Sequence, residues 1–492
     1  MLSKSRFVAG TQCHRLLWWK VHDPSAVELQ PDRVLQDRFD QGAQVGALAR
    51  DRFQDGVLID LPHRAYAERL EATQRAMEGG APAIFEASFV AHDTFVAVDV
   101  LAREAGDSWR LIEVKSASSL KDEHLNDAAV QLYVLGLNGL TVPAVEVMHL
   151  NKEFRHPDQS DLLARAEVTG DVEPLLAGIP EEIDAQLAML EAPTPPDVAV
   201  GPHCYEPRDC PFLDRCWPQE PDHIRHLYNV GPKKCNDYMA AGVHRIPDIP
   251  QKQKDKLPFA AKRQLHAMRE NCLIVERGLA KALEPFSGRL GFLDFETIMR
   301  AVPVWPGMAP WEQAAAQFSY HEALADGEYT HAEFLAEGSH DARPKLARAM
   351  IEATAGAERV VTYTSFEKTR IRGLQLAVPS LRAELVELEG KLIDMHPLLR
   401  DYVYHPDFRG SFSLKYVLTP LVPELTYTDL VIVDGLVASV EIARLLFVAQ
   451  KIPLDERARV RQDLLAYCER DTWAMVKLLE RLRQLALGAR LS

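Results

Sequence analysis

Short runs in which apolar and polar residues alternate recur along the chain, and alternation with period two is typical of half-buried β-strands. In the N-terminal part, IFEASF predicts a strand at residues 84–89, and FVAVDVLAREAGDSWRLIEVK predicts a β-hairpin at residues 95–115. The run AAVQLYVLG, residues 128–136, follows and predicts a helix. Alternating strands and helices of this kind predict an α/β domain over residues 1–220.

The C-terminal part has the same mixture of elements. The runs RLGFLDFET, AAQFSYHEA and YTHAEFLAE predict three strands, and the last two join through a turn at Asp326–Gly327. A helix over residues 341–354, the strand RVVTYTSF and the strongly periodic helix LLAYCERDTWAMVKLLERL follow. Three strands followed by a helix and a strand resemble a ribonuclease-H-like α/β core, which we expect over residues 289–492.

Residues 221–288 lie between these parts and predict a helical linker with few strand signals. Its sequence VGPKKCNDYMAAGV resembles a helix-hairpin-helix turn, whose backbone amides hold phosphates, and Lys233 and Lys234 would add positive charge there. The most basic run comprises Lys252, Lys254, Lys256, Lys262 and Arg263. A solvated helix face is the favoured interpretation of that run.

Composition narrows the class of protein. The 492 residues suit two or three domains, and 47% hydrophobic with 26% charged residues is an ordinary globular balance. No apolar run approaches the roughly 18 residues of a membrane span, and MLSKSRFVAG lacks a secretory apolar region, so we expect a cytoplasmic protein without membrane contact. A net charge of −15 excludes a chain-wide basic surface, but it is compatible with the acidic clusters of metal-dependent nucleases.

The predicted N-terminal hairpin carries the first candidate site. Glu113 and Lys115 are i and i+2 on one strand and share a face, and Asp99 can converge on them from the neighbouring strand. Two carboxylates bind Mg²⁺ or Mn²⁺ through oxygen, and an ammonium beside them can stabilise developing negative charge. Glu86, on the preceding strand, could add a carboxylate. A solvated sheet face with one salt bridge is the alternative interpretation.

Gln131 and Tyr133, on the following helix, lie close enough in sequence to border the same site. The series Asp99, Glu113-Val-Lys115 and Gln131-x-Tyr133 resembles the PD-(D/E)xK nucleases of the RecB and Cas4 type. The resemblance implies that Asp99 and Glu113 are metal ligands, that Lys115 is catalytic, and that Gln131 and Tyr133 form the motif of the RecB-like branch. Family members often carry a metal-binding His on the first helix, whereas GAQVGALAR has none.

Four of the seven cysteines form the second candidate site. Cys13 precedes the predicted nuclease core, and Cys204, Cys210 and Cys216 follow it within a Pro-rich stretch, spaced C-x5-C-x5-C. Four thiolates from the two ends of a domain suit a [4Fe–4S] cluster or a structural zinc ion, and the wide spacing favours iron–sulfur. The alternative is four unrelated thiols. The arrangement resembles the iron–sulfur staple of Cas4 and AddB-type nucleases, which clamps the ends of the domain. Cys235, Cys272 and Cys468 are interpreted as ordinary thiols.

The third candidate site is C-terminal. Asp294 and Glu296 share one face of a predicted strand, and Tyr467 and Asp471 are i and i+4 on one helix face. Together with Glu367, which follows the strand RVVTYTSF, these residues predict a nest of four carboxylates for two divalent ions, with Tyr467 orienting the attacking water. Surface pairs and helical coincidence are the alternative for each motif taken alone.

These motifs resemble the DEDDy 3′–5′ exonucleases, with Asp294-Phe-Glu296 as motif one and Tyr467-x3-Asp471 as motif three. Motif two departs from the family, because Thr364 and Glu367 stand where Asn and Asp are usual. Asp394, in KLIDMHPLL, is an alternative fourth ligand. Ser413 and Lys415, in GSFSLKYVL, are candidate phosphate contacts, although a capped helix start explains them equally well.

The whole chain resembles bacterial proteins that fuse a RecB/Cas4-like nuclease with its cysteine staple to a C-terminal exonuclease module. We therefore expect a metal-dependent DNA nuclease with two active sites, acting in DNA repair, end processing or phage defence. RNA processing by the C-terminal module is one alternative. A nucleic-acid-binding scaffold with one or both sites inactive is another, although Lys115 and Asp471, which a scaffold would be expected to lose, are both present.

Overall fold

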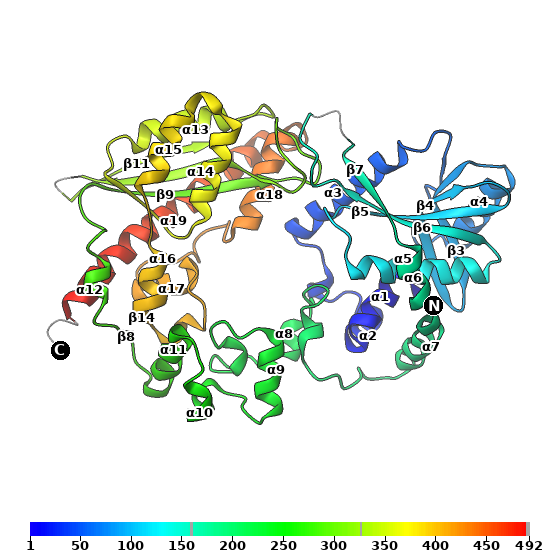
Figure 1. Cartoon of the computed structure of the whole chain (residues 1–492), viewed down its shortest axis with the longest axis horizontal. Coiled ribbons are helices and arrows are strands. Elements are labelled where there is room, and N and C mark those ends of the chain that lie inside the picture. The colour runs from blue at the N-terminus through cyan, green and yellow to red at the C-terminus, as the bar shows by residue number, and fades with distance from the viewer. Residues whose placement is uncertain (158–160, 325–326, 489–492) are drawn as a thin grey trace. The chain divides into compact units, whose positions relative to one another are not determined.

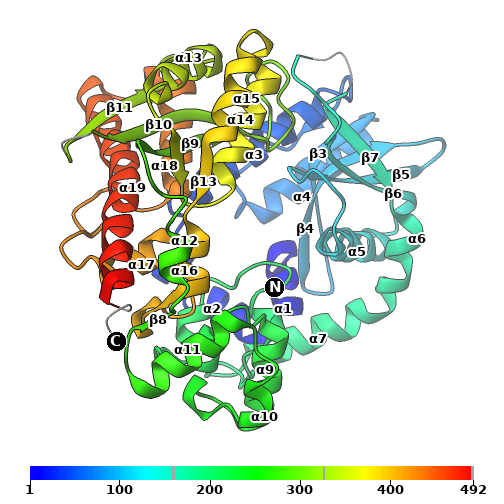
Figure 2. The same cartoon turned by 60° about the vertical axis from the view of Figure 1, so that its left-hand side comes forward.

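The computed structural model describes residues 1–157, 161–324 and 327–488. The chain has a mixed α/β architecture in two compact units (Figures 1 and 2). The first unit consists of Met1–Trp217 and Arg300–Trp311, and the second of Pro218–Met299 and Glu312–Ser492. Residues 221–288, expected as a separate linker, are therefore grouped with the C-terminal half of the chain.

One sheet forms the centre of the first unit, in the order β2-β3-β4-β5-β6-β7 with β1 paired to β4. Its strands are β1 (Leu2–Ser3), β2 (Val57–Leu58), β3 (Ala83–Ala91), β4 (Thr94–Arg103), β5 (Ser108–Lys115), β6 (Thr141–Leu150) and β7 (Leu163–Glu167). The helices are α1 (Lys4–Gln12), α2 (His14–His22), α3 (Arg33–Arg50), α4 (Tyr66–Glu78), α5 (Asp122–Leu137), α6 (Thr169–Val172), α7 (Ile179–Leu190) and α8 (Leu213–Cys216).

Both faces of this sheet are buried under helices, which fits the apolar composition of its central strands. On one face α5 packs through residues such as Ala129 and Val134 against Leu111 and its neighbours. On the opposite face α3 packs through Val45 against Ile112 and its neighbours. Residues 300–311 join the α3 face, where Arg300 Nη1 donates to Asp37 Oδ1 at 2.7 Å.

The alternation of faces is interrupted where β3 and β4 pass each other at Glu86 and Asp99. Val98 belongs to the α5-side core and Val100 to the α3-side core, although residues i and i+2 of a regular strand share one face. Glu86 has a positive φ of 58°, a backbone conformation that a residue with a side chain adopts only under strain. The irregularity lies at the level of Asp99.

The second unit is built on the sheet β11-β10-β9-β12-β13. Its strands are β9 (Leu290–Met299), β10 (Gln313–Ala323), β11 (Tyr329–Leu335), β12 (Arg359–Thr362) and β13 (Leu392–Asp394), and a separate pair joins β8 (Ile274–Val275) to β14 (Val403–Tyr404). Strands β9, β10 and β11 are antiparallel, whereas β12 runs parallel to β9 and β13. Of the predicted turn at Asp326–Gly327, Asp326 lies outside the described residues.

The helices of this unit lie on both faces of the sheet. They are α9 (Pro232–Ala240), α10 (Gln251–Lys254), α11 (Phe259–Glu270), α12 (Leu279–Ala282), α13 (Arg343–Thr354), α14 (Phe366–Ala377), α15 (Arg382–Lys391), α16 (His396–Tyr402), α17 (Leu414–Leu421), α18 (Gly435–Phe447) and α19 (Leu454–Gly488). Among the described helices, none combines the length and apolarity that a membrane crossing requires.

Period-two alternation in β9 and β10 separates the apolar core from the polar face. Leu293, Phe295 and Phe318 point into the core that α13 and α14 cover. Asp294 and Glu296 alternate with them, so they point to the other face, over which the long α19 packs (Figure 1). In the register of the sheet Asp294 is paired with Ser319 and Glu296 with Gln317.

Candidate active sites

The first candidate site lies where β4 and β5 separate. Their pairing ends at Val100 and Ile112, and beyond this point β1 pairs with β4 at Thr94 and Phe95. In the opening between the strands, Asp99 Oδ2 accepts a hydrogen bond from the backbone N–H of Val114 at 2.7 Å. The divergence of the strands therefore places the Asp99 carboxylate beside the Glu113–Lys115 segment.

Glu113 is the centre of this site and is 1% exposed. Lys115 Nζ lies 2.7 Å from Glu113 Oε1, and Gln131 Nε2 donates to Glu113 Oε2 at 2.7 Å. Lys115 also pairs with Asp127 on α5. Three of the residues predicted from the sequence, Glu113, Lys115 and Gln131, are thus in direct contact.

Lys4 is a member of the site that the sequence analysis missed. It follows directly on β1, and its ammonium contacts both carboxylate oxygens of Glu113, at 2.9 and 3.0 Å. A lone lysine near the chain start carries no local motif, and only the pairing of β1 with β4 brings it here. A divalent cation that binds both Glu113 oxygens would have to displace this ammonium.

The two carboxyls of the site titrate in opposite directions. Desolvation, followed by repulsion from Glu113, raises the pKa of Asp99 to about 7. Burial opposes the charged form of Glu113 too, but the ammonium groups of Lys115 and Lys4 hold its pKa well below the ordinary value. One carboxyl of the pair is therefore ionised throughout the physiological range, and the other is poised near neutrality.

Glu86 and Tyr133 make their side-chain contacts with residues outside the Glu113 group. The Glu86 carboxylate lies 3.4 Å from Nη2 of the buried Arg69. Tyr133 is two residues after Gln131 on α5, so it leaves the helix on a different side, and its hydroxyl lies 3.0 Å from His92 Nδ1. The role of these two residues as site members stays a prediction.

A pocket of about 330 Å³ opens beside Lys115 and Asp127. Its walls come from α1, α2, β5, α5 and the segment around Arg208, and they include Lys4, Lys20 and Arg208. Four of its side chains are cationic, so the pocket can hold an anionic ligand next to the carboxylates. The four cationic side chains outnumber the two carboxylates of the pocket, Asp127 and Asp209.

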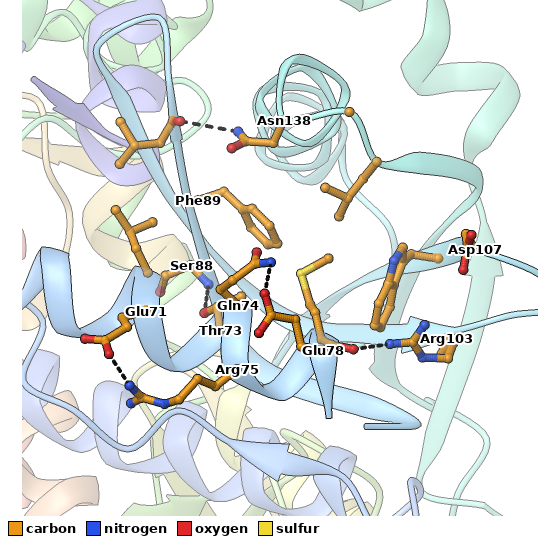
Figure 3. A pocket seen from close by; sticks show the side chains of 16 residues that line it. Glu71, Thr73, Gln74, Arg75, Glu78, Ser88, Phe89, Arg103, Asp107 and Asn138 are labelled. Atoms are coloured by element: carbon orange, nitrogen blue, oxygen red, sulfur yellow. Dashed lines mark hydrogen bonds and ion pairs between the residues drawn. The ribbon is translucent and has the colours of Figure 1, made fainter. Parts of the chain in front are cut away.

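A second, larger hollow of about 840 Å³ lies between α4 and the strands β3 to β5 (Figure 3). Its polar side chains bond to one another or to the backbone: Gln74 Nε2 donates to Glu78 at 2.8 Å, and Arg103 Nη2 donates to the Met77 carbonyl at 2.7 Å. Polar groups that are already paired do not converge on a ligand. We therefore assign no chemistry to this hollow.

The four cysteines of the predicted staple line one small cavity. Gln12 Nε2, at the end of α1, donates to the carbonyls of His203 and Arg208 at 2.9 and 2.7 Å and so ties this loop to the chain start. Burial, with repulsion between the thiolates, raises the pKa of Cys210 to about 11. Thiols gathered in this way suit a thiolate-binding iron–sulfur cluster or zinc, whose positive charge would favour the deprotonated form.

The second candidate site is the acidic cluster on the α19 face of β9. Asp294, Glu296 and Asp471 each offer a carboxylate oxygen, and these oxygens lie within 4.8 Å of one another. Glu296 and Asp471 are both 7% exposed. Burial and mutual repulsion raise the pKa of Asp294 and Glu296 well above ordinary values, and burial raises that of Asp471 to about 6. Uncompensated carboxylates of this kind attract a cation.

Glu367 joins this cluster from the first turn of α14. It is 3% exposed, its Oε2 is buried without a hydrogen-bond partner among the described residues, and its charge acts on Asp294. Burial raises its pKa to about 7. Asp394, the alternative fourth ligand, instead accepts a hydrogen bond from the His396 N–H at 2.9 Å. The group whose oxygens lie within 4.8 Å consists of Asp294, Glu296 and Asp471, and Glu367 as the fourth ligand stays a prediction.

Tyr467 and Lys415 complete one side of the cluster. Lys415 Nζ donates to the Tyr467 hydroxyl at 2.8 Å and also reaches the Val433 carbonyl. The nearby carboxylates and burial raise the pKa of Tyr467 far above its ordinary value, so the phenol stays protonated. Lys415 thus lies inside the site, where it can compensate negative charge. Ser413, the other candidate phosphate contact, accepts no side-chain capping bond although it precedes α17.

Two further members of the second site escaped the sequence analysis. The Tyr427 hydroxyl donates to Asp471 Oδ1, and Cys468 Sγ lies 3.7 Å from Asp294 Oδ2. Cys468 is therefore not the ordinary thiol that was expected. The only sequence signal for Cys468 was its place between Tyr467 and Asp471, whereas Tyr427 lies in an irregular segment without a recognisable spacing.

Lys233 and Lys234 are exposed in the first turn of α9. The expected helix-hairpin-helix would need a second helix, and the segment continues through turns to the single-turn α10. In this part of the second unit the structure thus offers exposed charge without a paired helical hairpin.

Comparison with known proteins covers part of the second unit. Residues 291–413 match a family described as Domain of unknown function (DUF2779). The matched segment contains Asp294, Glu296 and Glu367, whereas Tyr467 and Asp471 follow it in the chain. No curated protein matches the chain.

Proposed function

We propose that the protein is a metal-dependent nuclease with one active site in each unit, acting on DNA. The observation that carries the proposal is the acidic cluster of Asp294, Glu296 and Asp471, whose oxygens lie within 4.8 Å of one another. All-oxygen donors suit Mg²⁺ or Mn²⁺. Such ions, when bound, activate a water for attack on a phosphodiester and stabilise the leaving oxygen.

The surroundings of the cluster support a 3′–5′ exonuclease of the DEDDy type. The strand order β11-β10-β9-β12-β13 is the third, second, first, fourth and fifth strand of the sheet, which supports the ribonuclease-H-like proposal. Asp294 and Glu296 hold the ions from β9, and Asp471 holds them from α19. Tyr467 keeps its proton and can orient the attacking water or a phosphate oxygen through a hydrogen bond from its hydroxyl, while Lys415 holds that hydroxyl in place.

For the first unit we propose a PD-(D/E)xK active site. Asp99 and Glu113 hold the cation, Gln131 orients Glu113, and Lys115 stabilises charge on the attacked phosphate. The cationic pocket beside Lys115 supports binding of a nucleic acid backbone. The four cysteines hold a [4Fe–4S] cluster, with zinc as the alternative, and the loop that carries them forms one wall of this pocket through Arg208 and Pro211.

The test compares end-labelled single- and double-stranded DNA and RNA, digested with Mg²⁺ or Mn²⁺ by wild type, Lys115→Ala and Asp294→Ala. Each variant should lose at least about 10²-fold of one activity, because each removes a preorganised charge from one site. The exposed Lys152→Ala and Asp248→Ala serve as matched controls and should digest like wild type. Full activity of both site variants would refute the proposal, and preference for RNA would redirect it to RNA processing.

A further inference from the structure

A second group of metal-binding side chains lies on the same sheet face as the acidic cluster but shares no residue with it. His321 on β10 and His331 on β11 are directly paired in the antiparallel register, and their rings stack with centroids 4.5 Å apart. Glu469, on α19, offers a carboxylate to the same point. One ligand atom from each of these three residues lies within 4.8 Å of the others.

Hydroxyl groups behind the two imidazoles support one pattern of protonation of the ring nitrogens. In this pattern the Thr472 hydroxyl donates its only hydrogen to the Glu469 carbonyl, at 3.0 Å. Its oxygen must therefore accept the bond that joins it to Ser319 Oγ at 2.8 Å. It must likewise accept from His321 Nδ1, also at 2.8 Å.

The same assignment of hydrogens extends to the imidazole of His331. Ser319 has donated its hydrogen to Thr472, so Ser319 Oγ must accept from His331 Nε2 across 3.0 Å. Each ring then carries its proton on the nitrogen that faces a hydroxyl. A lone pair remains on Nε2 of His321 and on Nδ1 of His331, as in metal-ligating histidines whose other ring nitrogen donates a hydrogen bond.

We propose that His321, His331 and Glu469 bind a divalent transition metal, with zinc as the best fit, which clips α19 to the β10–β11 hairpin. Two imidazoles and one carboxylate are borderline donors that favour zinc over magnesium. His331 and Glu469 are exposed, so they can adjust around an ion and leave a fourth position for water. Thr472 of α19 bonds to Ser319 and His321 and directly follows Asp471 in the chain. The ion would therefore fix the position of α19 next to a residue of the acidic cluster.

Cobalt(II) is the probe, because tetrahedral nitrogen and oxygen ligation gives much stronger visible absorption, at longer wavelength, than octahedral binding to an acidic cluster. The background for the test is full-length protein carrying Asp294→Asn and Glu296→Gln, in which metal binding by the acidic cluster is removed and the His321, His331 and Glu469 site is intact. Binding at the cysteines is recognised separately by sulfur-to-cobalt charge-transfer bands. We expect this background to bind one equivalent with tetrahedral absorption, and zinc to compete for it.

His331→Ala and Glu469→Gln should each abolish binding of this one equivalent of cobalt. Ser319→Ala should lower the affinity for cobalt about 10- to 100-fold, as loss of a supporting hydrogen bond does. The exposed His340→Ala is the matched control and should bind like the background. Zinc should also raise the unfolding temperature of the Asp294→Asn, Glu296→Gln protein, but not that of the same protein with Glu469→Gln added. Because the Glu469 side chain is exposed, this substitution should not disturb the fold. Unchanged cobalt stoichiometry in both ligand variants would overturn the proposal.

Discussion

At the scale of single residues, charge compensation distinguishes the two proposed active sites. In the first site Lys4 and Lys115 neutralise Glu113 directly, at 2.7 to 3.0 Å. In the second site the oxygens of three carboxylates lie within 4.8 Å of one another, and Lys415 donates its hydrogen bond to the Tyr467 hydroxyl. The second site therefore has the larger unmet demand for cations, and the first has an internal competitor for them.

This difference predicts the behaviour of Lys4→Met. Because the Lys4 ammonium contacts both Glu113 oxygens, its removal should leave each oxygen with one fewer partner and make it more accessible to a metal ion. We expect the Mn²⁺ concentration that half-saturates the Lys115-dependent activity to fall about tenfold, which corresponds to about 1.4 kcal/mol. Titration of the activity with Mn²⁺ in an Asp294→Ala background measures this half-saturating concentration. A rise in the Mn²⁺ requirement would show instead that Lys4 supports the bound ion.

At the scale of elements, the first unit is closed by contacts between its two ends. The loop that carries three cysteines contacts α1 through Gln12, and Arg208 of the same loop pairs with Glu123 of α5 at 2.6 Å. Arg215, on α8, binds Glu28 and Asp23 near the chain start. A cluster or ion held by Cys13 and the loop would reinforce this closure.

Cys210→Ser should therefore lose bound iron, with its broad visible absorption, and lower the unfolding temperature of the first unit by several degrees. Anaerobic purification, metal analysis and circular dichroism provide the measurement. The exposed Cys272→Ser is the control and should keep both metal and stability. One equivalent of zinc without iron in anaerobic wild type would assign the site to zinc, while equal stability of the two variants would contradict the closure.

At the scale of the whole molecule, the acidic cluster makes the stability of the second unit depend on pH. In the metal-free protein burial raises the pKa of Asp471 to about 6 and of Glu367 to about 7, from ordinary values of 3.8 and 4.5. A raised folded-state pKa gives stability that is complete below the unfolded-state value and is lost as pH rises through the folded-state value. The loss therefore falls between about pH 4 and pH 7.

We accordingly expect the metal-free second unit to unfold at a lower temperature at pH 8 than at pH 5. Mn²⁺ should restore stability at pH 8 and have little effect at pH 5, where protons already neutralise the cluster. Calorimetry with EDTA or Mn²⁺ measures both effects. Glu296→Gln removes one buried charge and should flatten the pH dependence, and a wild-type transition that is insensitive to pH would refute this account.

The sequence by itself determined the elements and most of the second site. Asp294 and Glu296 share a face because strand side chains alternate, and Tyr467 and Asp471 share a face because four residues nearly complete a helical turn. The mixed α/β architecture followed from the same periodicities. Such rules are local, so they hold before the chain is folded.

Only the tertiary structure decided which of these faces meet. Lys4 and Tyr427 reach carboxylates far away in sequence, and no local spacing records such contacts. A positive φ interrupts the alternation of β3 at Glu86, and Tyr133 contacts His92 because two residues along a helix point in different directions. The His321 and His331 pair depends on the register of β10 with β11 and on α19 above them, which is fixed by long-range packing and not by the neighbours of either histidine.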